Sequence, residues 1–112
     1  MLNNRDDFLK EAERIITEER QKQYGDPGAN FLTTARLWQA YLDYEINPED
    51  VAIMLALLKI ARMATGRFKD DNWVDALGYL AIGAELKVNQ DKIDPVDDDE
   101  EPCVRVRQLS EY

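Results

Sequence analysis

Hydrophobic residues recur along this chain at the three- and four-residue spacing of helices, and no segment of the first 90 residues alternates as a strand does. Four segments carry the helical pattern, and residues that favour helix starts or turns separate them. We expect helices over about 4–23, 30–44, 48–64 and 71–88. The pattern therefore predicts an all-α, four-helix bundle-like domain over residues 1–90.

Two boundaries between these helices are marked by residues with a clear conformational preference. Asn47 can cap the free N–H groups of the third helix, Pro48 suits its first position, and the two acids that follow lie at the positive end of the helix dipole. Between the first two helices, Tyr24-Gly25-Asp26-Pro27-Gly28 has the composition of a turn.

The third helix is apolar on all sides. Twelve of the fourteen residues from Val51 to Ala64 are hydrophobic, and the exceptions are Lys59 and Arg62. A helix of this kind is buried on all sides. A domain this small needs a second subunit to bury it, so we expect a homodimer or a homotetramer.

The charge of the chain is uneven and limits its partners. From Asp91 to Tyr112, eight acids against three bases leave minus 5 of the total net charge of minus 9. We therefore expect residues 91–112 to form an acidic, flexible or extended tail. An acidic chain without a basic stripe repels nucleic acid, so we expect no DNA or RNA partner.

Neither a membrane-spanning segment nor a secretion signal is apparent in the sequence. A single cysteine, Cys103, excludes an intrachain disulfide and fits a reducing compartment. We expect no membrane partner and a cytoplasmic location.

The missing residue types restrict the possible chemistry. The chain has no histidine, and its only serine is Ser110. Serine–histidine or cysteine–histidine catalysis and histidine-bound zinc are therefore excluded. A catalytic metal would have to be held by carboxylates and other oxygens, which favours magnesium or manganese over zinc.

The charged residues inside the last two helices form the candidate site. Lys59 and Arg62 share one side of the third helix, and Asp71 and Asp75, four residues apart, share one side of the fourth. The short connection predicts antiparallel helices, which brings the end of one beside the start of the other. All four side chains should then converge at one helical hairpin.

Two interpretations of this cluster remain open. In the first it is a structural ion-pair network, in which Arg62 pairs with Asp71 or Asp75 while the tip of Lys59 reaches solvent. In the second, the carboxylates hold a divalent cation and the two bases contact phosphate oxygens. Glu19 lies within the apolar stripe of the first helix, where it is either solvated or paired with a neighbouring base, or is directed inward. If it is directed inward, it would be a third acid of the site, as metal ligand or as general base.

Several short motifs resemble those of a phage and prophage family of unknown function, over roughly residues 10–88. They are Gln23-Tyr24-Gly25-Asp26, Asn30-Phe31, Leu37-Trp38, Tyr41, Glu49-Asp50-Val51-Ala52, Leu58-Lys59-Ile60-Ala61-Arg62, Asp70-Asp71-Asn72-Trp73-Val74-Asp75 and Gly78-Tyr79. The resemblance implies a phage or prophage origin, so the expected cytoplasmic location would be that of the bacterial host cell.

The order Tyr-Gly-Asp, Lys-x-x-Arg and Asp-Asn-x-x-Asp is more distantly similar to a phage nucleotide-modification-associated domain. The start of the fourth helix also resembles the second metal-binding helix of MazG-like all-α nucleotide pyrophosphohydrolases. That resemblance implies magnesium held by Asp71 and Asp75. Asn72 stands where the family has a glutamate, and the third helix lacks the family's acidic pair, so Glu19 would supply the remaining carboxylate.

These resemblances imply a magnesium-dependent protein that binds a nucleotide or hydrolyses nucleoside triphosphates. Lys59 and Arg62 would contact the phosphates, and Tyr24, Asp26 and Asn30 would border the site. The alternative is a non-enzymatic, acidic phage accessory protein that binds a host or phage protein, with Lys59, Arg62, Asp71 and Asp75 forming only the ion-pair network.

Overall fold

The computed structural model describes residues 2–19 and 27–93, and these residues form helices and short connections without a strand. The helices are α1 (Arg5–Arg14), a π-helical turn η1 (Ile15–Glu19), α3 (Pro27–Leu42), α4 (Pro48–Thr65) and α5 (Asp70–Ile93). The predicted all-α, bundle-like fold of four helices is confirmed. No helix in these two ranges is both long and apolar enough to cross a bilayer.

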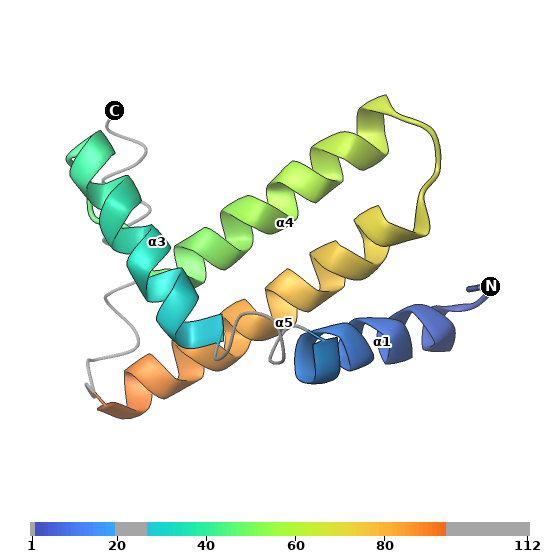
Figure 1. Cartoon of the computed structure of the whole chain (residues 1–112), viewed down its shortest axis with the longest axis horizontal. Helices are drawn as coiled ribbons and strands as arrows, with labels where there is room; N and C mark the ends of the chain where they lie inside the picture. The colour runs from blue at the N-terminus through green and yellow to red at the C-terminus, as the bar shows by residue number, and fades with distance from the viewer. Residues whose placement is uncertain (1, 20–26, 94–112) are drawn as a thin grey trace.

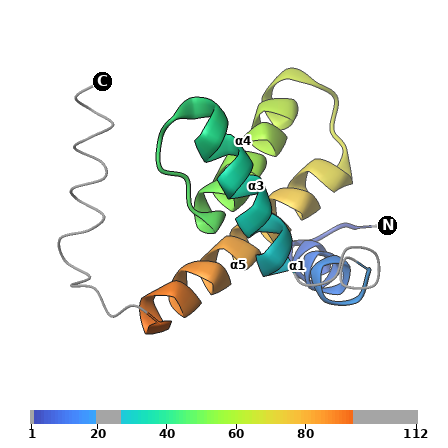
Figure 2. The same ribbon diagram turned by 60° about the vertical axis from the view of Figure 1, so that its left-hand side comes forward.

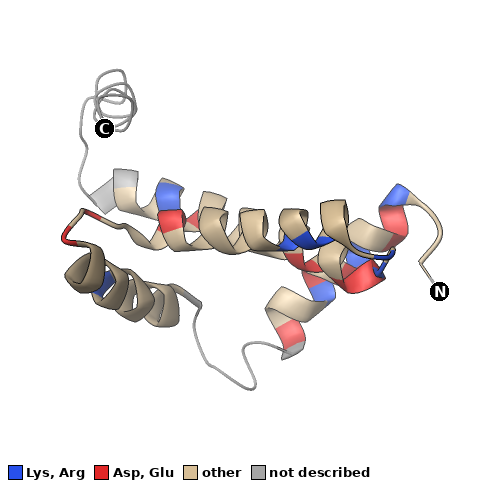
Figure 3. Ribbon diagram, turned by 90° about the horizontal axis from the view of Figure 1, so that it is seen from above, with Lys and Arg blue, Asp and Glu red and all other residues tan. Residues whose placement is uncertain are grey.

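The fold is organised around an antiparallel hairpin of α4 and α5, which pack side by side along their length (Figure 1). The helix α3 packs across α4, and α1 packs against α5 (Figure 1 and Figure 2). Figure 3 shows α1 and α3 on the same side of the hairpin. The described chain is therefore a two-layer structure, with the hairpin as one layer and α1 and α3 as the other.

The first helix begins where the sequence predicts. The Asp7 N–H donates to Asn4 Oδ1 at 2.9 Å, and Asp7 Oδ2 accepts from the Asn3 N–H at 3.0 Å and the Asn4 N–H at 3.3 Å. This reciprocal arrangement is a capping box. The two backbone donors favour the ionised carboxylate, so the pKa of Asp7 lies below its usual value.

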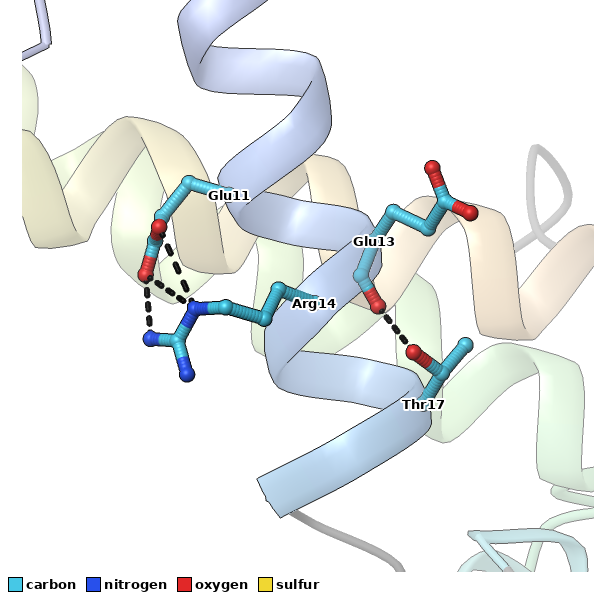
Figure 4. A network of polar contacts seen from close by, with 4 residues as sticks. All are labelled: Glu11, Glu13, Arg14 and Thr17. Carbon is cyan, nitrogen blue, oxygen red and sulfur yellow. Dashed lines mark hydrogen bonds and ion pairs between the residues drawn. The ribbon is translucent and has the colours of Figure 1, made fainter.

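The prediction of one α-helix over 4–23 is wrong for residues 15–19, and its end over 20–23 is not tested. From Ile15 the backbone widens into the π-helical turn η1, and residues 20–26 lie outside the described chain. Three consecutive β-branched residues, Ile15-Ile16-Thr17, begin this turn, and such residues crowd an α-helix. Figure 4 shows the polar contacts at the junction, where Arg14 pairs with Glu11 and Thr17 Oγ1 donates to the Glu13 carbonyl at 2.7 Å.

The second predicted helix begins earlier and ends earlier than expected. Its first residue is Pro27, whose fixed φ suits a first helical position, so the predicted turn over 24–28 can include only residues up to 26. The helix ends at Leu42, after which Asp43 takes a left-handed φ of 53°.

The core lies where α3, α4 and α5 meet. Its buried residues are Phe31, Ala35, Val51, Ala52 and Ile82, and the ring of Phe31 packs 6.4 Å from that of Tyr79. Two glycines of α5 allow close approach to the neighbouring helices. A Cβ at Gly83 would lie 2.9 Å from the Ala52 Cβ, and one at Gly78 would lie 2.9 Å from Ile16 Cγ2.

The start of α4 is held by Asp50, whose Oδ2 accepts from the Asn47 N–H at 2.8 Å. This contact confirms the predicted helix start at Pro48. Within the single chain, however, α4 is buried on one side only. Five large side chains of the other side are between 41% and 56% exposed, namely Ile53, Met54, Leu57, Leu58 and Ile60.

The last helix is longer than predicted. It continues to Ile93, beyond the expected end near Val88 and past the expected start of the tail at residue 91. Its last turns reach the start of α4: with its amide oriented to donate, Gln90 Nε2 lies 3.0 Å from the buried Glu49 Oε2. The tail over 94–112 lies outside the described residues and stays a prediction.

Candidate functional site

The candidate site lies at the connected end of the α4–α5 hairpin, where residues 66–69 join the two helices. The Gly66 N–H donates to the Arg62 carbonyl at 3.0 Å, and the Asn72 N–H donates to the Lys69 carbonyl at 3.2 Å. These bonds attach the connection to the last turn of α4 and to the first turn of α5. The connection is therefore ordered by its neighbouring helices.

An ion pair crosses the hairpin next to this connection. Lys59 Nζ lies 2.8 Å from Asp75 Oδ2, and the two side chains are 15% and 30% exposed. The predicted convergence of basic and acidic side chains is therefore present. The partners differ from the ion-pair interpretation, because Lys59 rather than Arg62 pairs with an aspartate, and its tip faces α5 instead of solvent. Among the described residues, Arg62 has no ion-pair partner.

A groove of about 550 Å³ lies beside this ion pair. Its lining is unusually basic for a chain with a net charge of minus 9, since it has four bases and one acid. The lining residues are Lys59, Arg62, Thr65, Gly66, Arg67, Lys69, Asp71 and Asn72. We call this surface the hairpin groove.

Three of the predicted site residues therefore line the hairpin groove, namely Lys59, Arg62 and Asp71. Asp75 lies next to it through its pair with Lys59. Asn30 is exposed on α3 and does not line the groove.

The remaining predicted residues come from the segment before α3. Glu19 ends η1, and its side chain lies outside the description, as do Tyr24 and Asp26 entirely. Their predicted roles as third acid and as border of the site stay predictions.

Sequence reasoning missed Arg67 and Lys69. Both follow Gly66 in a connection that the helical pattern treats only as a turn. The signal that could have identified them is the spacing itself, because Lys59, Arg62, Arg67 and Lys69 are the only charges between Asp50 and Asp70. Four bases within eleven residues at the end of a hairpin have to gather on one small surface.

The predicted magnesium site is incomplete in the described chain. Within residues 2–19 and 27–93, no group of three or more acidic, cysteine or histidine side chains is close enough to hold a metal ion. Asp71 is exposed in the groove, whereas Asp75 is already bound to Lys59. The carboxylates alone do not make a cage, and a cation here would need further oxygen ligands.

The fold and the groove define a small all-α protein with a basic cleft at one end of a helical hairpin. A family model described as a domain of unknown function, DUF6378, matches residues 7–87. The chain belongs to this family, and its relatives include phage proteins.

Two relatives are named Gene 55 protein. The one from Mycobacterium phage L5 is 40% identical over 86 residues, which cover 76% of this chain and 55% of the relative. The one from Mycobacterium phage D29 is 43% identical over 72 residues, which cover 64% of this chain and 48% of the relative. The chain thus spans about half the length of the curated relatives it matches. No solved structure matches it.

Proposed function

We propose that the hairpin groove binds the phosphate groups of a nucleotide. The observation that carries this proposal is the gathering of Lys59, Arg62, Arg67 and Lys69 around one groove of a strongly acidic chain. Like charges repel, so a structure that concentrates them gains most when an anion binds among them.

The residue types suit phosphate oxygens. Arginine presents a planar fork of donors that matches two phosphate oxygens at once, and lysine adds a compact positive charge. The groove also lies at the N-terminal end of α5, a 24-residue helix whose dipole is positive there.

The structure favours different roles for residues that the sequence placed in one cluster. The Lys59–Asp75 pair favours a structural role for those two side chains, as in the ion-pair interpretation. Arg62, Arg67 and Lys69 then remain for the ligand. The ion pair therefore supports the structural interpretation for Lys59 and Asp75 only, and the proposed binding of phosphate rests on the other three bases of the groove.

Magnesium fits this proposal as part of the ligand complex. In nucleotide sites Mg²⁺ is commonly held by one or two carboxylates together with phosphate oxygens and water. Asp71 offers the exposed carboxylate in the groove. Hydrolysis of a triphosphate, which the resemblance to MazG-like enzymes implies, would further require a general base, for which Glu19 is the candidate.

A ligand panel tests the proposal on the full chain. Deoxynucleoside and ribonucleoside triphosphates, pyrophosphate and inorganic phosphate are titrated with and without Mg²⁺, with heat of binding, Tm and pyrophosphate release as readouts. We expect triphosphates to bind and to raise the Tm, and we expect affinity to fall as salt screens the charges. If no compound changes the Tm or gives heat at millimolar concentration, the proposal is wrong.

A charge reversal identifies the groove as the binding surface. Arg62→Glu should weaken triphosphate binding by about tenfold or more, because it replaces an attraction to phosphate by a repulsion. The matched control is Arg36→Glu, which makes the same change at an exposed position of α3. Equal weakening in both variants would show that only the total charge matters and would contradict a site in the groove.

A further inference from the structure

The side of the hairpin away from α1 and α3 is an exposed apolar surface. At the spacing of about 100° per residue, one line of α4 holds Ile53, Leu57, Ile60 and Ala64, and one line of α5 holds Trp73, Leu77, Leu80 and Ala84. Ile53, Leu57 and Ile60 are 46%, 56% and 45% exposed, and Trp73 and Leu80 are each 47% exposed. In Figure 3, the central part of the hairpin's other side is free of charged residues.

The two lines form one continuous surface. The Lys59–Asp75 ion pair and the approach of Ala52 to Gly83 fix how the helices are aligned. That alignment places Leu57 beside Leu77, and Ile60 beside Trp73. We call this surface the open face.

The described chain has too little core to leave this face exposed. Five of its nine buried hydrophobic residues are alanines, and Val51 is the only large side chain below 2% exposure. Fourteen large hydrophobic side chains are exposed instead. A layer of helices that is apolar on both sides needs a second layer on each side. Here α1 and α3 supply one of them.

We infer that the open face packs against the open face of a second copy of this chain. The two hairpins then form a four-helix core at the centre of a symmetric dimer, which α1 and α3 of each copy cover from outside. A second copy is the partner that the composition favours, because interfaces without charges at their centre resemble a domain core and are typical of homodimers.

The size of the open face is consistent with this partner. The twelve residues from Ile53 to Ala64 extend about 18 Å, and two helices are about 20 Å wide, so the flat area is roughly 400 Å². Side-chain relief raises the accessible area of the face above this flat area, towards the about 800 Å² per partner of a standard interface.

The dimer leaves the hairpin groove accessible. Arg62 lies about half a turn around α4 from Ile53 and Ile60, so it projects away from the open face. The dimer inference therefore stands independently of the proposed function.

Sedimentation velocity and light scattering on the full chain test the inference. At micromolar concentration we expect a species of twice the 13.0 kDa chain mass. Leu57→Glu should weaken self-association on the order of 100-fold, because it places a charge at the centre of an apolar interface. Leu37→Glu, at a position of α3 that is 66% exposed and far from the open face, should leave the dimer intact.

Circular dichroism at matched concentrations separates dissociation from unfolding. A Leu57→Glu variant that is monomeric, keeps the helical signal and partly loses thermal stability supports the inference. A Leu57→Glu variant that is unfolded when dilute and folds at higher protein concentration supports it as well. A wild-type chain that is monomeric at these concentrations would overturn it, since its own residues 94–112 or a different protein would then cover the face. An oligomer that Leu57→Glu leaves intact would overturn it equally.

Discussion

Gly83→Val is expected to lower the free energy of unfolding by about 3 kcal/mol, the upper part of the range for overpacked cores. A Cβ at this position would lie 2.9 Å from the Cβ of Ala52, which is fully buried. The added branched side chain has no space between α4 and α5 at this point, so the two helices would have to separate. Urea unfolding followed by circular dichroism measures the loss.

Asn89→Val is the control for this substitution. It places the same residue in the same helix at an exposed position, and valine and asparagine have similar helix propensities, so we expect a change within about 0.5 kcal/mol. A Gly83→Val protein as stable as the wild type would contradict the close packing of the hairpin on which the groove depends.

Asp75→Ala is expected to lower the free energy of unfolding by about 2 kcal/mol, less than for a fully buried pair because the carboxylate is 30% exposed. The loss arises because the Lys59 ammonium, at 15% exposure, would have no partner. Adding Lys59→Met to this variant removes the stranded charge, so the double variant should be more stable than Asp75→Ala alone.

Asp71→Ala is the matched control for the ion pair. It removes an exposed carboxylate one turn earlier, in the first turn of α5, so stability should fall by only about 0.3–1 kcal/mol through the lost interaction with the helix dipole. If magnesium bridges Asp71 and the ligand, the same variant should lose the magnesium dependence of triphosphate binding. Similar stability losses for Asp71→Ala and Asp75→Ala would contradict the assignment of Lys59 to Asp75.

The starts of α1 and α4 could be predicted because they depend on neighbouring residues. Asn4 with Asp7, and Asn47 with Asp50, make their contacts within one turn, so their spacing in the sequence determines them. Other contacts join residues far apart in the sequence, since a Cβ at Gly78 would lie 2.9 Å from Ile16 Cγ2, 62 positions earlier in the chain. Periodicity alone does not contain that contact.

The position of the candidate site could be predicted, but which basic side chain forms an ion pair with which aspartate could not. Antiparallel helices joined by a short connection bring Lys59 and Arg62 near Asp71 and Asp75, and this follows from spacing. Which base pairs with which acid depends on small rotations of α4 against α5. The bases of the connection were missed because their directions follow from the local backbone of residues 66–69, which has no repeating pattern.

Amide chemical shifts of the full chain show whether phosphate binds in the hairpin groove. Titration of ¹⁵N-labelled protein with a deoxynucleoside triphosphate and Mg²⁺ should move the amide signals of residues 66–72 and the Arg62 Nε signal most, with one saturating curve. Signals on α3 such as Arg36 should stay in place. Saturating shifts confined to α3 or to other surfaces, or no shifts at millimolar ligand, would contradict phosphate binding in the hairpin groove.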